Sequence, residues 1–186
     1  NLNKLQLLFW LYLKSRLIKD MAKKSFRIDF EYDFDFILIG ICSPLKDYHM
    51  CYQLNKELGT SLYRSSSDVS MDFYEEIEKG QFSLYEYWDE QYENQWYLLS
   101  NKCKILCHDE LQNEGTIFDG FIHEEKKTKY LIPENSKVDF YIQVHGIFSE
   151  NAKLEMIKNI KKLNRVVNAY EICINDIASK ENLIIK

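Results

Sequence analysis

The chain has 186 residues, of which 46% are hydrophobic, 15% aromatic and 28% charged, a composition typical of a folded domain that excludes a disordered chain. The formal net charge is −5 and stays negative without residues 1–20, so neither nucleic acid nor an anionic membrane is expected as the main partner. Five cysteines at irregular spacing predict free thiols and a reducing, cytoplasmic location rather than a disulfide framework.

The first twenty residues differ from the rest of the chain. Leu5–Leu13 is an apolar run too short to cross a bilayer as a helix, and no small-residue cleavage site follows it. Met21 begins a stretch that reads like an ordinary amino terminus. We therefore expect residues 1–20 to be an upstream extension and residues 21–186 to form a single domain, with an amphipathic helix or an export signal as alternatives.

The amino-terminal half begins with Phe26–Asp33, where apolar and polar residues alternate as in a strand with an acidic outer face. Phe34–Ile41 breaks this alternation, which favours a helix, although its β-branched residues leave a strand open. Ser43, followed by proline, predicts the N-cap of a helix. Apolar residues then recur at helical spacing up to Leu58, and Gly59 is expected to end that helix.

The middle of the chain contains a series of short apolar stretches that predict strands, at residues 61–64, 69–74, 82–88, 95–99 and 104–107. Residues 108–129 are polar and are expected to form a loop around a short strand at 116–122. Because turns rather than helices separate these strands, an antiparallel sheet is favoured.

The last third predicts a strand, a helix and two further strands. Val138–Val144 alternates as in a half-buried strand, with Val138, Phe140, Ile142 and Val144 on the inner face. Ser149 is the expected N-cap of a helix that buries Leu154, Ile157, Ile160 and Leu163 and exposes Lys153, Lys158, Lys161, Lys162 and Arg165. Residues 167–174 and 183–185 read as strands. The whole pattern predicts an α+β fold, a single domain with an antiparallel β-sheet and two principal helices packed on one face.

Residues 131–140 read Leu-Ile-Pro-Glu-Asn-Ser-Lys-Val-Asp-Phe. Pro133 favours extended geometry at Ile132, and the polar residues after it have turn composition. This stretch resembles the signature of the bacterial IPExxxVDY family of small proteins. A second block, Asp35–Lys56, is similar to that family's amino-terminal block through its Lys-Asp-Tyr and Leu-Asn sequences.

The resemblance extends over roughly Phe26 to the carboxy terminus, but only these two blocks are specific. Phe140 stands where the family has tyrosine, which removes a hydroxyl group. The family is named after its motif and has no established activity, so the resemblance implies no reaction, substrate or cofactor.

The two blocks supply a hypothetical binding site that comprises Lys46, Asp47, Tyr48, Asn55, Pro133, Glu134, Asp139 and His145. If the first helix packs on the strand that carries Asp139, Lys46 is expected to pair with Glu134 or Asp139. Structural roles are open for the same side chains. Aspartate in a first helical turn is favoured by the helix dipole, Glu134 can cap its own turn, and His145 can be a satisfied edge residue.

Aromatic residues are concentrated in the predicted hairpin, at Tyr85, Tyr87, Trp88, Tyr92 and Trp96. About half of them are expected in the core of the sheet. The others stand beside Asp89, Glu90 and Glu93 and predict an acidic-aromatic docking surface, which would suit a basic protein partner or self-association as a homodimer.

Motifs for catalysis are not found in the sequence. It contains no glycine-rich phosphate loop, no Gly-x-Ser-x-Gly and no His-Glu-x-x-His, so no catalytic residue and no cofactor is expected. Cys42 and Cys51 read as small buried hydrophobes, and Cys103–His108 lacks the second ligand pair of a zinc site. The favoured function is a non-enzymatic protein-binding or regulatory module. The alternative is a small enzyme or ligand-binding domain that uses Lys46/Asp47 and Glu134/Asp139.

Overall fold

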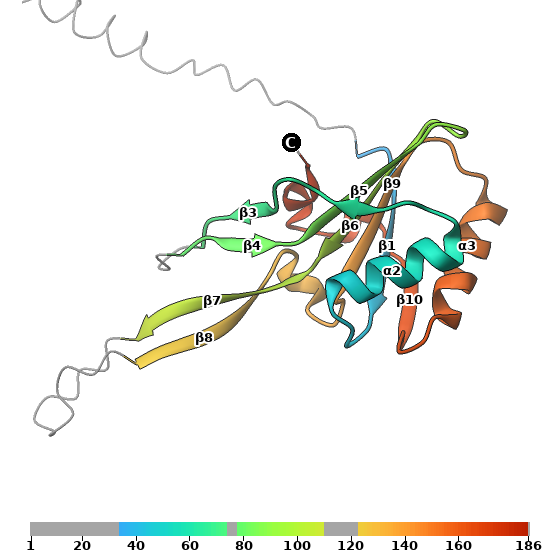
Figure 1. The fold of residues 1–186 in the computed structure, drawn as a ribbon. Helices are drawn as coiled ribbons and strands as arrows, with labels where there is room; N and C mark the ends of the chain where they lie inside the picture. Colours follow the sequence, from blue (N-terminus) through green and yellow to red (C-terminus); the bar gives the residue numbers. More distant parts are fainter. Residues whose placement is uncertain (1–33, 74–77, 110–122, 186) are drawn as a thin grey trace, which may run out of the picture. The chain divides into compact units, whose positions relative to one another are not determined.

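A computed structural model describes residues 34–73, 78–109 and 123–185, all of which belong to one compact unit, Phe34–Lys186 (Figure 1). The expected extension at residues 1–20, the first strand at Phe26–Asp33 and the short strand at 116–122 lie outside the described residues.

The described unit is built on one antiparallel sheet of six strands in the order β10-β1-β9-β6-β5-β2. Two antiparallel ladders hold its centre together, with Ile142 of β9 opposite both Ile39 of β1 and Leu98 of β6. The strands span β1 Phe36–Cys42, β2 Tyr63–Arg64, β5 Leu84–Asp89, β6 Asn94–Ser100, β9 Phe140–His145 and β10 Asn168–Glu171.

Two smaller antiparallel pairs and two helices complete the described structure. The pairs are β3 (Val69–Met71) with β4 (Gly80–Phe82), and β7 (Lys102–Asp109) with β8 (His123–Tyr130). The helices are α2 (Asp47–Leu58) and α3 (Glu150–Lys162). Short 3-10 turns lie at η1 (Pro133–Asn135), η2 (Ile174–Asp176) and η3 (Lys180–Leu183).

Both helices cover the same face of the sheet, as Figure 1 shows. Met50 and Leu54 of α2 and Met156 and Ile160 of α3 pack against one hydrophobic cluster with Ile39, Ile41, Leu98, Ile142 and Val144 of the sheet. Burial of this apolar surface is the main force that holds the helices on the sheet. The predicted α+β fold, with an antiparallel sheet and two helices on one face, is confirmed.

A second hydrophobic cluster covers the opposite face. Leu38, Leu99 and Tyr141 of the sheet pack there against Phe82 of β4, Ile105 of β7 and the carboxy-terminal residues Ile177 and Leu183. β9 is therefore buried on both faces rather than on one, and Tyr141 and Gln143 are buried although they alternate with the apolar residues. Val138 also belongs to this second cluster, so its predicted place beside Phe140 on the inner face was wrong.

The first element after residue 33 is a strand. Phe36–Cys42 forms β1, which lies between β9 and β10. The helix favoured at 34–41 was therefore wrong, and the alternative of a strand is correct. Its three isoleucines all pack on the helix side of the sheet, whereas Leu38 packs in the opposite cluster, because both faces of the sheet are covered. Helix α2 begins at Asp47 with Lys46 as N-cap, rather than at Ser43. Gly59 ends the helix in the left-handed conformation, as predicted, with φ 70°.

Later elements contain two further corrections and one confirmation. Residues 123–130, expected within a loop, form strand β8 because β7 offers them a partner along its whole length. Residues 183–185, expected as a strand, contain the end of the 3-10 turn η3. In α3 the Ser149 cap is confirmed, since Ala152 N–H donates to Ser149 Oγ at 3.2 Å.

The predicted inner face of α3 is confirmed at Ile160, which is buried in the helix-side cluster, and at Ile157 and Leu163, which pack against that cluster, but it is wrong at two neighbouring positions. Leu154 is 60% exposed, whereas Lys153 is buried and its Nζ atom lies between Glu150 and Glu171, at 2.8 Å from each. Lys153 therefore joins α3 to the edge strand β10 instead of belonging to a solvated basic face.

Candidate functional site

A polar cleft of about 520 Å³ lies where the loop before α2 meets the start of β9. Segments far apart in the sequence line it: the β1–α2 loop, β2 with the loop after it, the β4–β5 junction and the β6–β7 turn. Its polar lining residues are Ser43, Lys46, Asp47, Arg64, Asp68, Gln81, Ser83, Ser100, Lys102, Lys104 and Asp139. The cleft thus brings together Lys46, Asp47 and Asp139 of the predicted binding site.

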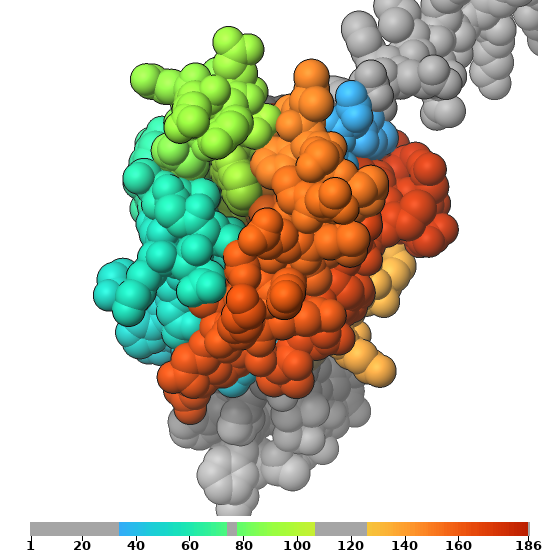
Figure 2. Space-filling model, turned by 90° about the vertical axis from the view of Figure 1, so that its right-hand side faces the viewer, coloured from blue at the N-terminus to red at the C-terminus, as the bar shows by residue number. Residues whose placement is uncertain are grey.

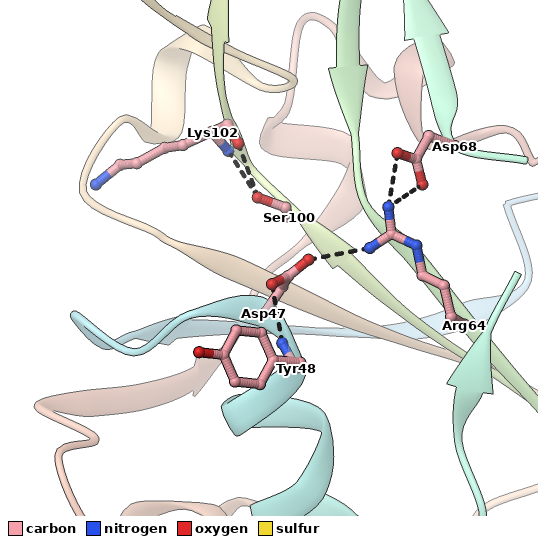
Figure 3. A network of polar contacts seen from close by, with 6 residues as sticks. All are labelled: Asp47, Tyr48, Arg64, Asp68, Ser100 and Lys102. Carbon is pink, nitrogen blue, oxygen red and sulfur yellow. Dashed lines mark hydrogen bonds and ion pairs between the residues drawn. The ribbon is translucent and has the colours of Figure 1, made fainter.

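Arg64 links two carboxylates on one side of this cleft, as Figure 3 shows. Its Nη1 atom lies 3.0 Å from Asp47 Oδ2, and its Nη2 atom lies 2.5 Å from Asp68 Oδ1 and 2.7 Å from Oδ2. The guanidinium also stacks over the ring of Tyr85 at 5.2 Å. Arginine suits this position because its planar donor fork binds carboxylates and stacks on aromatic rings at the same time.

Asp47 remains ionised in this arrangement. Burial alone would raise the pKa of its carboxyl, but hydrogen bonds from Ser83 and from the Tyr48 N–H, together with Arg64, lower the pKa below its ordinary value. The first turn of α2 is thereby tied to β2 and to the β4–β5 junction.

Asp139 is held on the other side of the cleft. Its Oδ2 atom accepts from Ser43 N–H at 2.7 Å, and its Oδ1 atom lies 2.5 Å from Lys102 Nζ. Lysine 102 therefore takes the place in which Lys46 was expected. Lys46 lines the same cleft, but its ammonium group lies 6.0 Å from the ring centre of Tyr48.

Two other predicted residues, Glu134 and Asn55, have structural partners elsewhere. Glu134 follows Pro133 in the exposed turn η1, and its carboxylate accepts from Ser179 N–H at 2.7 Å and from Ser179 Oγ at 2.6 Å. Asn55 accepts from Leu62 N–H at 2.8 Å and donates to the Leu62 carbonyl at 2.9 Å, so it fastens the chain after α2.

His145 lies at the far end of β9 from Asp139. Its ring packs against Phe36 and Tyr97, and its Nε2 atom is 2.8 Å from Gln143 Nε2. Burial lowers the pKa of this imidazole below its ordinary value, while Asp35 acts in the opposite direction. The structure therefore does not bring His145 into the cleft.

A second depression, of about 580 Å³, is the acidic-aromatic groove. It lies between the end of α2, the tip of the β5–β6 hairpin and the start of α3, and Figure 2 shows the face on which these segments meet, in cyan, green and orange. The lining residues are Glu57, Leu58, Gly59, Thr60, Asp89, Tyr92, Asn94, Trp96, Ile147, Phe148, Ser149, Ala152, Glu155, Met156 and Asn159.

The hairpin aromatics divide between the core and the surface. Tyr85 and Trp96 are buried in the helix-side cluster, and Tyr87 packs against it. Trp88 is 50% and Tyr92 66% exposed, and Tyr92 also lines the groove. The expectation that about half of these rings belong to the core is confirmed.

Two buried polar atoms in residues that line the groove lack a hydrogen-bond partner among the described residues. They are Trp96 Nε1 and Asn94 Oδ1, in side chains that are more than nine-tenths buried. Most buried polar groups in folded proteins are paired, so two such atoms beside one groove are notable.

Sequence reasoning missed several lining residues of both depressions. Arg64 and Asp68 have opposite charges at a spacing of four, which was the one available signal for their ion pair. Ile147, 98% exposed, follows a glycine in a segment with no periodicity, and Glu57 and Glu155 come from two different helices. Nothing local in the sequence indicates that these residues meet.

The cysteines and histidines form no metal centre in the described part of the chain, where no three His, Cys, Asp or Glu side chains are grouped in that way. Cys103 is a buried free thiol, and Cys51 is a buried free thiol whose pKa is raised by burial to about 11. The side chains of Cys107 and His108 lie outside the description. Of the described helices, none is long and apolar enough to cross a membrane.

No protein-family model matches the chain, and neither a curated protein nor a solved structure is significantly similar to it.

Proposed function

We propose that this protein is a non-enzymatic protein-binding module, and that it binds a basic segment of a partner protein in the acidic-aromatic groove. The observation that carries the proposal is the lining of the groove, which combines three carboxylates and exposed apolar side chains with no lysine or arginine. Opposite charge selects and steers a partner, whereas buried apolar area supplies most of the binding free energy.

The charge of the groove supports a cationic occupant. Asp89 accepts hydrogen bonds from the backbone N–H groups of Gln91 and Tyr92, at 3.0 and 3.3 Å. Glu57 and Glu155 form no ion pair within the described residues, so both carboxylates are available to a partner. An arginine or lysine side chain that enters beside Tyr92 would gain Coulomb attraction and a cation–π contact together.

Apolar side chains support a protein rather than a small cation as the occupant. Ile147 is 98% exposed, and Phe148, Leu58 and Met156 line the groove beside it. A partner that places an aliphatic residue next to its basic one would cover this surface and exclude water from it. A backbone carbonyl of that partner could also accept from the indole N–H of Trp96 after a small side-chain shift.

The test begins with selection of binding peptides from a random peptide library against the intact chain. We expect the selected peptides to carry arginine or lysine next to an aliphatic residue. Their affinity is then measured by fluorescence anisotropy for the wild type and for Glu155→Lys. Reversal of this groove charge should weaken binding by about tenfold or more.

The matched control is Asp176→Lys, which makes the same charge change at an exposed residue that does not line the groove. We expect it to change affinity by about twofold at most, because exposed charges outside the contact are screened by salt. Selection of peptides without basic residues, or equal losses in the two variants, would show that the groove is not the docking site.

The resemblance to the IPExxxVDY family and the cytoplasmic location remain part of this proposal. Support for the resemblance comes from the polar cleft, where Lys46 and Asp47 of one motif block lie with Asp139 of the other. Support for a reducing compartment comes from Cys42, Cys51, Cys103 and Cys173, all of which are free thiols.

A further inference from the structure

We propose that the polar cleft is a second binding site, for a small oxyanion that presents several acceptor oxygens, such as a phosphate or a dicarboxylate. This site is separate from the groove, and its ligand is of a different class. The argument rests on which polar groups of the cleft already have partners and which do not.

Every carboxylate oxygen in the cleft already has a donor. The two oxygens of Asp68 are held by Arg64, those of Asp47 by Arg64 and the Tyr48 N–H, and those of Asp139 by Lys102 and the Ser43 N–H. The neutral acceptors are occupied too. Gln81 Oε1 accepts from Ser70 Oγ at 2.8 Å, and Ser100 Oγ accepts from the Lys102 N–H at 3.3 Å.

Several donors of the same cleft have no acceptor among the residues that the structure describes. The ammonium groups of Lys46 and Lys104 form no hydrogen bond or ion pair with any described residue, and the same holds for the amide nitrogen of Gln81. Lys46 directly precedes α2, Lys104 lies in β7 and Gln81 lies in β4. The three donors therefore line the cleft from different segments. A ligand that completes this set must supply acceptors.

The charge balance leads to the same chemistry. Four cationic side chains line the cleft against three carboxylates. Arg64 and Lys102 pair with all three carboxylates and leave that set with one negative charge, so Lys46 and Lys104 give the cleft a net charge of +1 and carry its unpaired ammonium groups. A metal ion would have to displace Arg64 or Lys102 from its carboxylates, whereas an oxyanion adds bonds without breaking one.

The test is isothermal titration of the intact protein with inorganic phosphate and, separately, with succinate, at constant ionic strength set by sodium chloride. We expect saturable one-to-one binding of at least one of them, and the pair distinguishes a phosphate site from a carboxylate site. The Lys46→Gln/Lys104→Gln variant should bind about tenfold more weakly or not at all. Both lysines are exposed, so their replacement should leave the fold intact.

Two controls separate this site from general attraction to a surface. Lys56→Gln/Lys158→Gln removes the same charge from exposed lysines outside the cleft and should bind like the wild type. Asp68→Asn should strengthen binding, because it releases part of the Arg64 guanidinium to the ligand. Absence of saturable binding, equal losses in the two lysine variants, or weaker binding by Asp68→Asn would each overturn the proposal.

Because the peptide test concerns the groove and this test concerns the cleft, either proposal can fail without the other. The lysine variants alter no residue that lines the groove.

Discussion

Asn55 lies in one of the two motif blocks, yet its side chain is used within the fold. Its amide bonds to both the N–H and the carbonyl of Leu62, and its Oδ1 atom also accepts from Thr60 Oγ1 at 2.9 Å. The residues that follow α2 cannot form a helix after Gly59, so their polar backbone groups need a side-chain partner. A single asparagine supplies that partner because it carries both a donor and an acceptor.

Asn55→Ala is therefore expected to destabilise the protein without a direct effect on either proposed site. Loss of partners for part-buried backbone groups should lower the free energy of unfolding by about 1–3 kcal/mol in urea denaturation. Asn151→Ala, at an exposed residue of α3, is the control and should change it by less than about 0.5 kcal/mol. A similar small change in both variants would show that the Asn55 bonds are not important for stability.

Glu134 is the glutamate of the stretch Leu131–Phe140. We expect it to make the stability of the folded protein depend on pH. Hydrogen bonds from the Ser179 side chain, and then from backbone N–H groups, lower the pKa of its carboxyl below the ordinary value of 4.5. A carboxyl whose pKa is lower in the folded state stabilises the fold above pH 4.5. That contribution is lost as the pH falls through the lowered folded pKa.

The measurement is the melting temperature of the wild type and of Glu134→Gln between pH 7 and pH 3. We expect the wild type to melt at the higher temperature at pH 7 and the difference to shrink in acid. A difference that stays constant across this range would mean that ionised Glu134 is not what stabilises its contact with Ser179.

At the scale of elements, Gly59 ends α2 and Gly146 follows β9, and the two differ in the space available for a side chain. Gly59 has φ 70° and open space around the position of an added Cβ atom. Gly146 has φ 132°, and an added Cβ atom there would overlap with Asn94 Oδ1 and approach the Asn94 Cα atom to 3.4 Å. Gly146 follows the end of β9 and precedes the groove residues Ile147 and Phe148. The backbone passes close to Asn94 at this point, and a residue without a side chain leaves room for it.

Gly146→Ala is expected to destabilise the fold more than Gly59→Ala does. The Gly59 variant should lose about 1 kcal/mol, which is the cost of a left-handed backbone for alanine. The Gly146 variant adds steric overlap to an unfavourable φ and should lose about 2–4 kcal/mol in chemical denaturation. Equal losses would mean that Asn94 moves aside freely.

At the scale of the whole molecule, the two proposed sites lie at opposite ends of the central strand. β9 starts at Phe140, which lines the polar cleft, and the groove residues Ile147 and Phe148 follow its end at His145. A strand of this length spans about 20 Å, which exceeds the Debye length of about 8 Å at physiological salt. Charges in one site therefore have little direct influence on the other.

Fold class could be predicted from the sequence because its signals are local. Helical spacing up to Leu58, the Gly59 stop and the Ser149 cap each depend on residues within a few positions of one another. The same holds for the hairpin whose strands became β5 and β6. Some of the carboxylates and aromatic rings that line the two depressions were also named from the sequence, among them Asp47, Asp139, Asp89 and Tyr92.

Only the tertiary structure decided which faces are buried and which charges meet. The alternation in Val138–Val144 predicted one buried face, but a second hydrophobic cluster covers the other face, so Gln143 is buried as well. Lys102 rather than Lys46 pairs with Asp139, because the β6–β7 turn, 37 residues away, brings Lys102 to the start of β9. A charge pair between distant segments depends on how sheets and helices pack. That packing is determined by residues throughout the chain, so the sequence around either charged residue does not indicate its partner.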